Sequence, residues 1–318
     1  MNATSTDVAK RAGVSRATVS QVLNGYADRF APDTAQRVIV AARELGYQPS
    51  AAGRALRRGS SDLVIALLPH TTFGGNLQDL FEQMTLALAD HGYTLVLRIS
   101  TLSSDMLDRM VAGMKPAAVF SLTPFTDTER EVLDRRSILS IDPPSVTQID
   151  HNRAIGELQA RILIERGHAH LAYAHLQDER QDPFGFARED GMRQIAAQHG
   201  IPRIDVTHVA LNLDSAKRAL DDVSPTPVAI ACYNDDVAMA LMSAARLSGL
   251  DIPAHVAVIG MDHTDISRIT VPRLTTIEYD MAAASVAGTA TLLRALGAGS
   301  PQQTPSPAAL SVIDGETV

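Results

Sequence analysis

The sequence is poor in cysteine and has no apolar run of membrane-spanning length. With Cys232 as the one cysteine among 318 residues, the chain can form neither an intramolecular disulfide nor a zinc site of several cysteines. Cys232 lies in an apolar run, which is typical of a buried core residue. At the N-terminus, polar segments with helix-capping residues stand where a signal peptide would have its apolar core. We therefore expect a cytoplasmic protein that does not associate with membranes.

The sequence also lacks the motifs that mark many enzyme sites. It has no G-x-S-x-G nucleophile elbow, no phosphate-binding P-loop, no G-x-G-x-x-G after a strand and no H-E-x-x-H. The adjacent aspartates at 221–222 and 235–236 diverge on a helix or strand, so neither pair is a good acid/base couple. His168 follows a helix end, and His170 and His175 lie along one strand in opposite phases, so we interpret them as surface or capping residues. We therefore expect a protein that is not an enzyme and that binds no metal and no cofactor.

Charge is divided unevenly along the chain. Residues 1–60 contain nine lysines and arginines against four aspartates and glutamates, a net charge of +5, which leaves −13 for the rest because the total is −8. A basic N-terminal part on an acidic remainder fits a protein that offers only that part to DNA phosphates, although an ordinary solvated surface can carry the same charges. The length of the chain predicts two or three domains.

The N-terminal residues predict a helix-turn-helix. Thr4 and Asp7 have the spacing of a capping box before a helix at 6–12, Gly13 marks a turn, and Ser15 is a good N-cap for a second helix. Apolar residues are spaced so that the two helices can pack together, which leaves an outer face for a DNA major groove. That face consists of Arg16, Ala17, Ser20, Gln21 and Asn24. Two short capped helices joined by a glycine also occur without any role in DNA binding.

A third helix and a basic segment follow. Pro32 suits the first position of a helix that runs to residue 45, with an apolar stripe to cover the first two helices and Gly46 at its end. The segment 49–59 is rich in alanine and arginine and too short to hold a helix unaided. Leu56, flanked by Arg54 and Arg57, has the chemistry of a minor-groove wedge whose guanidinium groups hold the backbone. The alternative is a basic linker whose leucine packs on the body.

From residue 62, apolar strands and helices alternate, which predicts a parallel α/β body. Its length predicts two doubly wound subdomains with a ligand crevice between them. The Pro/Gln/Ser-rich stretch 299–307 is interpreted as an exposed loop. The expected strands lie at 63–68, 93–99, 117–122, 138–141, 170–176, 206–211, 228–232 and 255–259, and the expected helices at 77–91, 104–114, 154–166, 186–199, 215–223, 235–248 and 282–297.

Three polar residues stand near the ends of expected strands, where open α/β sheets bind ligands. Arg188 lies near the start of the helix that follows the strand at 170–176. Asn234 follows the strand at 228–232, and Asp262 ends the strand that begins near residue 255. Together they offer donors and acceptors for a polar ligand, but asparagine and aspartate at strand ends are also common turn residues.

The motifs together resemble one family over nearly the whole chain. Asp7-Val8-Ala9, Ala12-Gly13-Val14-Ser15, Thr18-Val19-Ser20, Val22-Leu23-Asn24, Leu45-Gly46-Tyr47-Gln48-Pro49 and the segment 51–56 resemble the headpiece and hinge helix of the LacI/GalR family of bacterial transcriptional repressors. In the body the resemblance continues in Gly167-His168, Asn234-Asp235, Val258-Ile259-Gly260-Met261-Asp262 and Pro272-Arg273-Leu274-Thr275-Thr276-Ile277. The resemblance implies a periplasmic-binding-protein-like effector domain, a homodimer and control by a small molecule.

The resemblance also implies roles for single residues. Arg16, Ala17 and Gln21 match base-reading positions, while Thr18, Ser20 and Asn24 match residues that contact the DNA backbone. Leu56 matches an intercalating leucine. In the body, Arg188, Asn234 and Asp262 match effector contacts, and Asp142 is a poorer match.

This sequence departs from the family pattern at several of these positions. Gln21 stands where arginine is usual, Phe-Ala at 30–31 replaces Val-Ser, and His263 replaces a second aspartate after Asp262. The aromatic pair usual after the first strand is missing around 76–77. We therefore expect an unusual operator and a binding pocket with less ring stacking.

These observations favour a dimeric transcriptional regulator, most simply a repressor, that binds a palindromic operator. We expect a neutral, hydroxyl-rich effector to control whether the protein binds or releases this operator. The expected domains are a helix-turn-helix headpiece at 1–48, a hinge at 49–60 and an effector-binding body at 61–318. Its subdomains span about 61–149 with 279–303, and about 150–278 with 304–318. A transport-type solute-binding protein is one alternative, and an enzyme that uses the same crevice is another.

Overall fold

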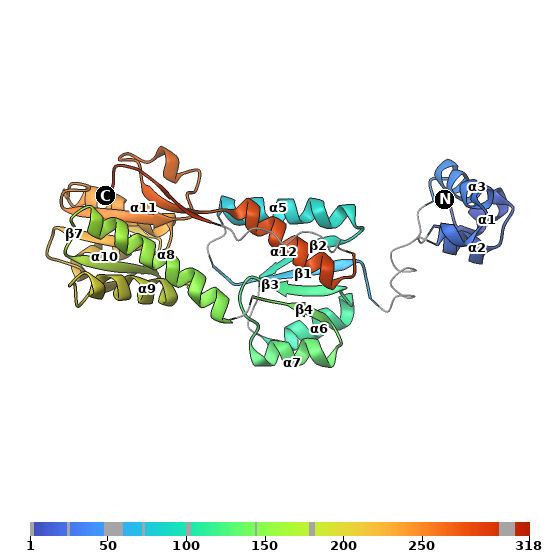
Figure 1. The fold of residues 1–318 in the computed structure, drawn as a ribbon, viewed down its shortest axis with the longest axis horizontal. Coiled ribbons are helices and arrows are strands. Elements are labelled where there is room, and N and C mark those ends of the chain that lie inside the picture. Colours follow the sequence, from blue (N-terminus) through green and yellow to red (C-terminus); the bar gives the residue numbers. More distant parts are fainter. Residues whose placement is uncertain are drawn as a thin grey trace. The chain divides into compact units, whose positions relative to one another are not determined.

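The structure, a computed structural model, describes residues 3–23, 26–47, 60–71, 74–99, 103–143, 145–177, 182–298 and 309–318 (Figure 1). The side chains at 75–76 and 145–149 are also not described. The chain divides into two units, Met1–Asp62 with Met114–Ala117, and Leu63–Gly113 with Ala118–Val318. The expected hinge at 49–60 lies, apart from residue 60, outside the described residues. The domain boundaries drawn from the sequence therefore remain predictions.

The first unit contains the helices that its caps predict. Helix α1 (Ser5–Ala12) begins at a capping box, in which Thr4 N donates to Asp7 Oδ2 at 2.8 Å and Asp7 N donates to Thr4 Oγ1 at 3.4 Å. It ends at Gly13, whose φ of 68° suits glycine best. Helices α2 (Arg16–Val22) and α3 (Pro32–Glu44) follow, with a 3₁₀ turn η1 (Ala27–Arg29) between them.

A small apolar core holds these three helices together. Its fully buried members come from each helix, namely Val8, Val19 and Val38, each 0% exposed. Small residues of α1 and α3, such as Ala12 and Ala42, let the helix backbones approach closely. Because α2 uses Val19 and Val22 for this contact, its opposite side remains on the surface.

The second unit contains two sheets, and the first is entirely parallel with the strand order β2-β1-β3-β4 (Figure 1). Its strands are β1 (Leu63–Leu68), β2 (Thr94–Ile99), β3 (Ala118–Ser121) and β4 (Leu139–Ile141). One face packs against α5 (Gly75–Asp90) and α12 (Met281–Ala295), and the other against α6 (Ser104–Met114) and α7 (Asp127–Arg135). Helices on both faces explain why β1 is a continuous apolar run.

The second sheet has the order β10-β9-β8-β7-β5-β6, with β10 antiparallel to its neighbour. Its strands are β5 (Leu171–Leu176), β6 (Asp205–Val209), β7 (Val228–Cys232), β8 (Val256–Met261), β9 (Thr275–Tyr279) and β10 (Leu310–Ile313). Helices α10 (Leu213–Asp222) and α11 (Asp235–Leu247) cover one face. Helices α8 (Ser145–Glu165) and α9 (Gly185–Gln198) cover the other. The fold class expected from the sequence is confirmed.

Helices α8 and α9 approach each other unusually closely, because a glycine of each lies against the backbone of the other. A Cβ built on Gly156 would overlap the carbonyl group of Arg188, and one built on Gly191 would overlap the carbonyl oxygen of Arg153. Only glycine leaves room for backbones at this separation. The crossing therefore fixes where α9 presents Arg188.

Candidate functional site

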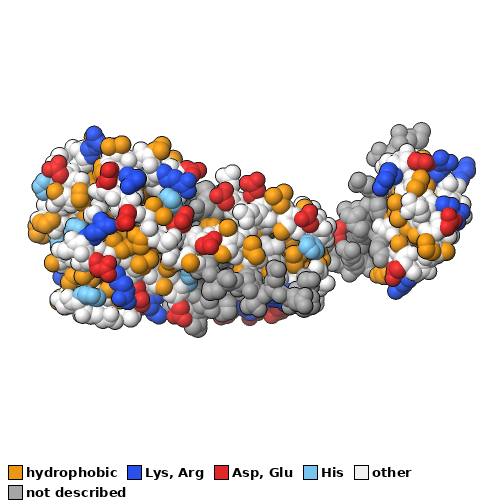
Figure 2. Space-filling view, turned by 45° about the horizontal axis from the view of Figure 1, so that its top comes forward, with side chains coloured by type: hydrophobic (Ala, Val, Ile, Leu, Met, Phe, Trp, Pro, Cys, Tyr) orange, Lys and Arg blue, Asp and Glu red, His pale blue; other side chains and the backbone are white. Residues whose placement is uncertain are grey.

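The outer face of α2 is the candidate DNA-reading surface. Arg16, Ala17 and Gln21 are exposed, whereas Val19 and Val22 of the same helix are buried. The side chains predicted to read bases thus lie on the side of α2 away from the core of the unit. Figure 2 shows several Lys and Arg side chains on the visible face of this unit. The contacts with DNA themselves remain predictions.

The start of α2 is held by two hydroxyl side chains. Ser15 Oγ accepts from Thr18 N at 3.0 Å, and the hydroxyl groups of Ser15 and Thr18 lie 2.9 Å apart. Ser15 is therefore the N-cap of α2, the Thr18 hydroxyl group is paired with it, and Ser20 is half-buried. The remaining predicted DNA contacts, Asn24, Arg54, Leu56 and Arg57, lie outside the described residues.

A cavity of about 650 Å³ in the second unit is lined by residues from both sheets. It lies at the carboxyl ends of parallel strands, since Ser121 ends β3, Asp142 follows β4, Tyr233 follows β7 and Asp262 follows β8. Ligands of open α/β sheets bind at this edge, and the volume suits a small molecule. Of the four predicted effector contacts, the cavity brings together Arg188, Asp262 and Asp142.

Arg188 is the most firmly positioned polar group of the cavity. It is only 6% exposed, its Nε donates to Asn152 Oδ1 at 3.0 Å, and its Nη1 donates to the carbonyl oxygen of Tyr233. The guanidinium carbon also lies 5.7 Å from the ring centre of Phe184 and 5.2 Å from that of Tyr233. These contacts fix a positive charge at the cavity wall before any ligand arrives.

Asp262 is the acid that complements Arg188. Burial raises its pKa to about 7, the charge of Arg188 opposes this rise, and Asp235 and Asp236 add to it. Near neutral pH its carboxyl group can therefore both accept and donate hydrogen bonds. Its φ of 104° is costly for a residue other than glycine, and such strain is common at ligand sites.

The other two predicted effector contacts already have protein partners. Asp142 Oδ2 accepts from Phe125 N at 2.7 Å and from Arg130 Nη2 at 2.8 Å. Asn234 is 3% exposed and caps α11, where its Oδ1 accepts from Val237 N at 3.0 Å, and it is not among the residues that line the cavity. A direct contact of Asn234 with a ligand therefore remains a prediction.

Sequence reasoning did not select several polar residues that line the cavity. Asn152 and His151 come from α8, whose start was placed nine residues too late, so they appeared to precede it. Tyr233 lies immediately before Asn234, and its hydroxyl group lies 3.1 Å from that of Thr71. Ligands bind at the carboxyl ends of parallel strands, and this rule, which selected Asn234, could have selected Tyr233 as well.

The interpretation of His175 as a surface or capping residue is wrong. It is 2% exposed, and its ring nitrogens lie 2.7 Å from Asp182 Oδ2 and 2.8 Å from Glu189 Oε2. Burial lowers its pKa, but hydrogen bonds and charge from Asp182 and Glu189 outweigh burial and raise it overall. Asp182 also accepts from Gly185 N, the first residue of α9, so this cluster supports the helix that carries Arg188.

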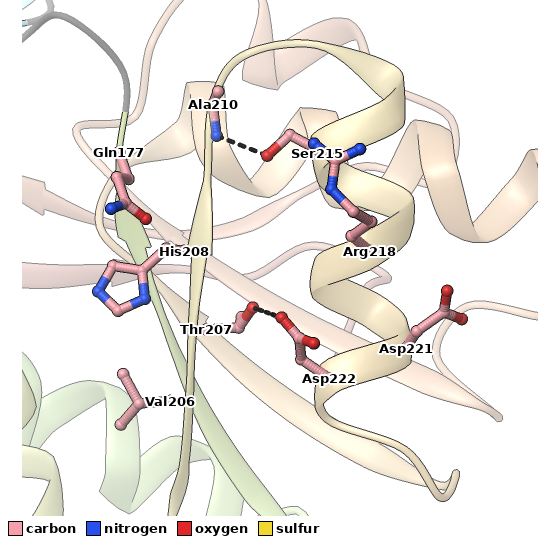
Figure 3. A pocket seen from close by; sticks show the side chains of 9 residues that line it. All are labelled: Gln177, Val206, Thr207, His208, Ala210, Ser215, Arg218, Asp221 and Asp222. Carbon is pink, nitrogen blue, oxygen red and sulfur yellow. Dashed lines mark hydrogen bonds between the residues drawn. The ribbon is translucent and has the colours of Figure 1, made fainter.

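A second hollow of about 530 Å³ lies beside β6 and α10 (Figure 3). Thr207 donates to Asp222 Oδ2 at 3.3 Å, and Ser215 Oγ accepts from Ala210 N at 3.0 Å, so these polar groups already have partners. The side chains of Asp221 and Asp222 point apart, as expected for an adjacent pair (Figure 3). Within the described part of the chain, no group of three His, Cys, Asp or Glu residues could hold a metal ion, and no helix is long and apolar enough to cross a membrane.

The fold and the cavity define a class of protein. A helix-turn-helix unit with an exposed second helix reads DNA in many regulators, and a two-sheet body with a cavity at the strand ends binds small molecules. A chain that contains both is a ligand-responsive DNA-binding regulator.

Comparison with known proteins identifies the family. Residues 4–50 match the model of bacterial regulatory proteins of the lacI family, and residues 160–318 match a periplasmic binding protein-like domain. The chain is 30% identical over 296 residues to the transcriptional repressor PurR of Vibrio campbellii, covering 86% of each chain. It is 30% identical over 302 residues to the ribose operon repressor of Halalkalibacterium halodurans, covering 88% of this chain and 87% of the relative. The chain therefore belongs to the LacI family of bacterial transcriptional regulators.

Two solved structures of transcriptional regulators have the same fold as this chain. The lac repressor dimer bound to operator and the anti-inducer ONPF superposes with a TM-score of 0.76 at 19% identity, covering 100% of this chain and 99% of that one. The transcriptional regulator CelR in complex with cellobiose superposes with a TM-score of 0.65 at 23% identity, covering 99% and 100%. The regulator has a DNA-binding headpiece and an effector-binding body.

Proposed function

We propose that this regulator represses transcription by binding a palindromic operator as a homodimer, and that a small neutral molecule in the 650 Å³ cavity controls this binding. The observation that carries the proposal is the combination, in one chain, of an exposed Arg16/Gln21 face on a capped helix and a cavity with a preset Arg188. Relatives named as repressors support the repressing direction. A homodimer presents two such faces to the two halves of a palindrome.

The proposed role of the basic segment rests on the sequence. We place Leu56 as a wedge in the minor groove of a bent operator, with Arg54 and Arg57 on the flanking phosphates. Ligand-driven closure of the cavity would change the distance between the two segments of a dimer. This couples the cavity to the headpieces without any direct contact between ligand and DNA.

The proposed effector carries hydroxyl groups. Arg188 can donate two parallel hydrogen bonds to neighbouring hydroxyl oxygens, and Asp262 can accept from hydroxyl groups when ionised. One arginine opposite one aspartate leaves the wall close to neutral, which does not suit a phosphate or a dicarboxylate. Two similar proteins carry names that refer to ribose and cellobiose, both neutral polyols.

Binding rather than catalysis is the proposed activity. The polar groups of the cavity are fixed by structural hydrogen bonds, as Arg188 is by Asn152 and Tyr233 and Asp142 is by Arg130. Such an arrangement suits ligand recognition, and the relatives are named as transcriptional repressors. We propose that the protein acts in the cytoplasm, where a bacterial chromosome lies.

Selection from random-sequence DNA tests this function. We expect the full-length protein to enrich a palindrome, and an Arg16→Ala variant to lose that enrichment while its body unfolds at an unchanged temperature. A solute-binding protein or an enzyme would enrich no sequence. Recovery of a non-palindromic site would contradict the dimeric arrangement, and recovery of no site would contradict the function itself.

A further inference from the structure

The second hollow, beside β6 and α10, follows the edge of a sheet. Strand β6 is the last strand of the six-stranded order and pairs with β5 on its inner side. Val206, Thr207 and His208 all line the hollow, although successive side chains of a strand point to opposite faces. Figure 3 shows this alternation, with Thr207 turned toward Asp222 of α10 and His208 turned the other way. A hollow that touches three successive residues runs along the outer edge of β6 rather than over one face.

The backbone of β6 offers hydrogen bonds at this edge. The carbonyl oxygen of Val209 accepts from Gln177 N, just after β5, at 2.9 Å, so the backbone groups of Val209 face β5. Successive residues of a strand direct their N–H and C=O groups to opposite edges, so Val206 and His208 direct theirs away from β5. In the part of the chain that the structure describes, no hydrogen bond is made to these outward groups. They are open to an added strand.

The α10 side of the hollow is charged. Arg218, Asp221 and Asp222 line it, and all three are exposed. Asp222 accepts from Thr207, whereas Arg218 and Asp221 form no hydrogen bond or ion pair with any other described residue. One helical turn, about 5 Å, separates Arg218 from the two aspartates, and alternate residues of an extended chain are about 7 Å apart. Alternate side chains of a strand in the hollow would therefore meet the guanidinium and the carboxylates in turn.

The other face of β6 presents uncharged surface. Val206 is half-buried, and the ring centre of His208 lies 5.2 Å from that of His175. Burial and the charge of His175 lower the pKa of His208, so its ring is neutral near pH 7. Phe186 lies on the same cluster, 5.1 Å from the His175 ring, and is 74% exposed. Apolar side chains of an added strand would pack on this side.

We propose that the edge of β6 binds an extended peptide segment of another protein, which adds to the six-stranded sheet as a further strand. A lysine or arginine of the peptide lies against Asp221 and Asp222, because two carboxylates outnumber one guanidinium on that side. Its alternate side chains are apolar and pack beside Val206 and His208. Lysine and proline often protect exposed edges, and β6 contains neither. Among the described residues, the hollow shares no lining residue with the effector cavity, so this partner surface lies beyond the proposed function.

Display selection with random seven-residue peptides on the full-length protein tests the proposal. We expect enrichment of sequences in which apolar residues alternate with polar ones and one polar position is lysine or arginine. Enrichment of no sequence, or of sequences without a basic residue, would overturn it.

Two replacements of His208 separate the backbone from the side chain. His208→Pro removes the outward N–H, and an edge strand tolerates proline where the N–H takes no part in the ladder. His208→Ala loses the same ring but keeps the N–H, which makes it the matched control. By fluorescence anisotropy, we expect the enriched peptide to bind His208→Pro about two- to tenfold more weakly than His208→Ala, the cost of one lost hydrogen bond. Equal affinity of the two variants would contradict strand addition.

A charge reversal on α10 gives a test that leaves β6 unchanged. Asp221→Lys should weaken binding of the enriched peptide at least about twofold. A second peptide, with its basic residue replaced by glutamate, should bind Asp221→Lys more tightly than it binds the wild type. If both affinities are the same in variant and wild type, the peptide lies elsewhere and the proposal is wrong.

Sedimentation of the same proteins distinguishes a peptide partner from a second copy of this chain. We expect the wild type, His208→Ala and His208→Pro to form the same oligomer at equal concentration. A smaller oligomer in His208→Pro alone would assign the edge of β6 to contacts between copies and overturn the peptide partner.

Discussion

Replacing Gly156 by alanine tests how the fold positions Arg188. The added methyl group would overlap the backbone carbonyl of Arg188, which is not the end of a flexible side chain and cannot rotate away. Helix α9 must therefore move away from α8. The movement disturbs the hydrogen bond from Arg188 Nε to Asn152 Oδ1, because these two side chains come from the two separated helices.

The expected cost follows from the overlap. Overpacking a close-packed site lowers the free energy of unfolding by about 1–3 kcal/mol. Alanine gains up to about 1 kcal/mol over glycine in a helix interior, so the net loss is about 0–3 kcal/mol and lies toward the upper end if the helices resist separation. At roughly 2–4 °C per kcal/mol for a domain of this size, a loss near 2 kcal/mol lowers Tm by about 4–8 °C.

Calorimetric unfolding of the full-length protein measures this change, with Gly113→Ala as the matched control. Gly113 also lies in a helix, but a Cβ there would meet no heavy atom within 4 Å, so its replacement should leave Tm unchanged or raise it. Affinity for the sugar or nucleoside that binds the wild type best should fall in Gly156→Ala alone. If Gly156→Ala and Gly113→Ala behave alike in both measurements, the close crossing does not position Arg188.

Three further predictions concern titration and DNA reading. Because the pKa of Asp262 is raised to about 7, the folded state loses stability as pH rises from about 4 to 7, and Asp262→Asn should remove that decline in urea-unfolding curves. The pKa of His175 is raised, so its contribution to stability is complete below about pH 6.5 and is lost at higher pH; His175→Gln should flatten this second decline. Gln21→Arg should shift the selected base at one symmetric operator position from adenine toward guanine, by about 1–3 kcal/mol. An unchanged pH profile or an unchanged base would contradict the respective prediction.

The sequence predicted the elements whose apolar residues are continuous or regularly spaced. Strand β1 and helix α6 have the predicted bounds, and the capping box of α1 lies at Thr4 and Asp7. Helix α7 was not predicted, because Val132 and Leu133 are its only apolar residues and all the others except Thr128 are charged. Its own capping box, Thr126 with Glu129, was an available signal.

Long-range pairing explains most other omissions. Strand β9 was not predicted, although Thr, Ile and Tyr favour strands, and β10 is a short strand that pairs antiparallel to it. Their strand character comes from each other and from β8, which no local pattern reveals. The predicted start of α8 is too late for a local reason, because the first turns of this helix have no regular apolar stripe.

The sequence predicted those cavity residues whose position follows from the topology of the sheets alone. Arg188 and Asp262 lie in the cavity because the ends of parallel strands converge there, whichever residues occupy them. The alternation of side chains between the two faces of β5 could not predict that His175 is buried. Helices cover both faces of this strand, so the side chains on both faces are buried.

The most direct test of the account is the operator affinity of the full-length protein as a function of ligand concentration. We would measure it by fluorescence anisotropy on the selected operator, with a panel of sugars and nucleosides, for the wild type and for Arg188→Ala. We expect at least one ligand to change the wild-type operator affinity tenfold or more. Arg188→Ala should bind the operator equally well without ligand and should not respond. Ligand-independent operator binding by the wild type, or an equal response of both proteins, would contradict this expectation.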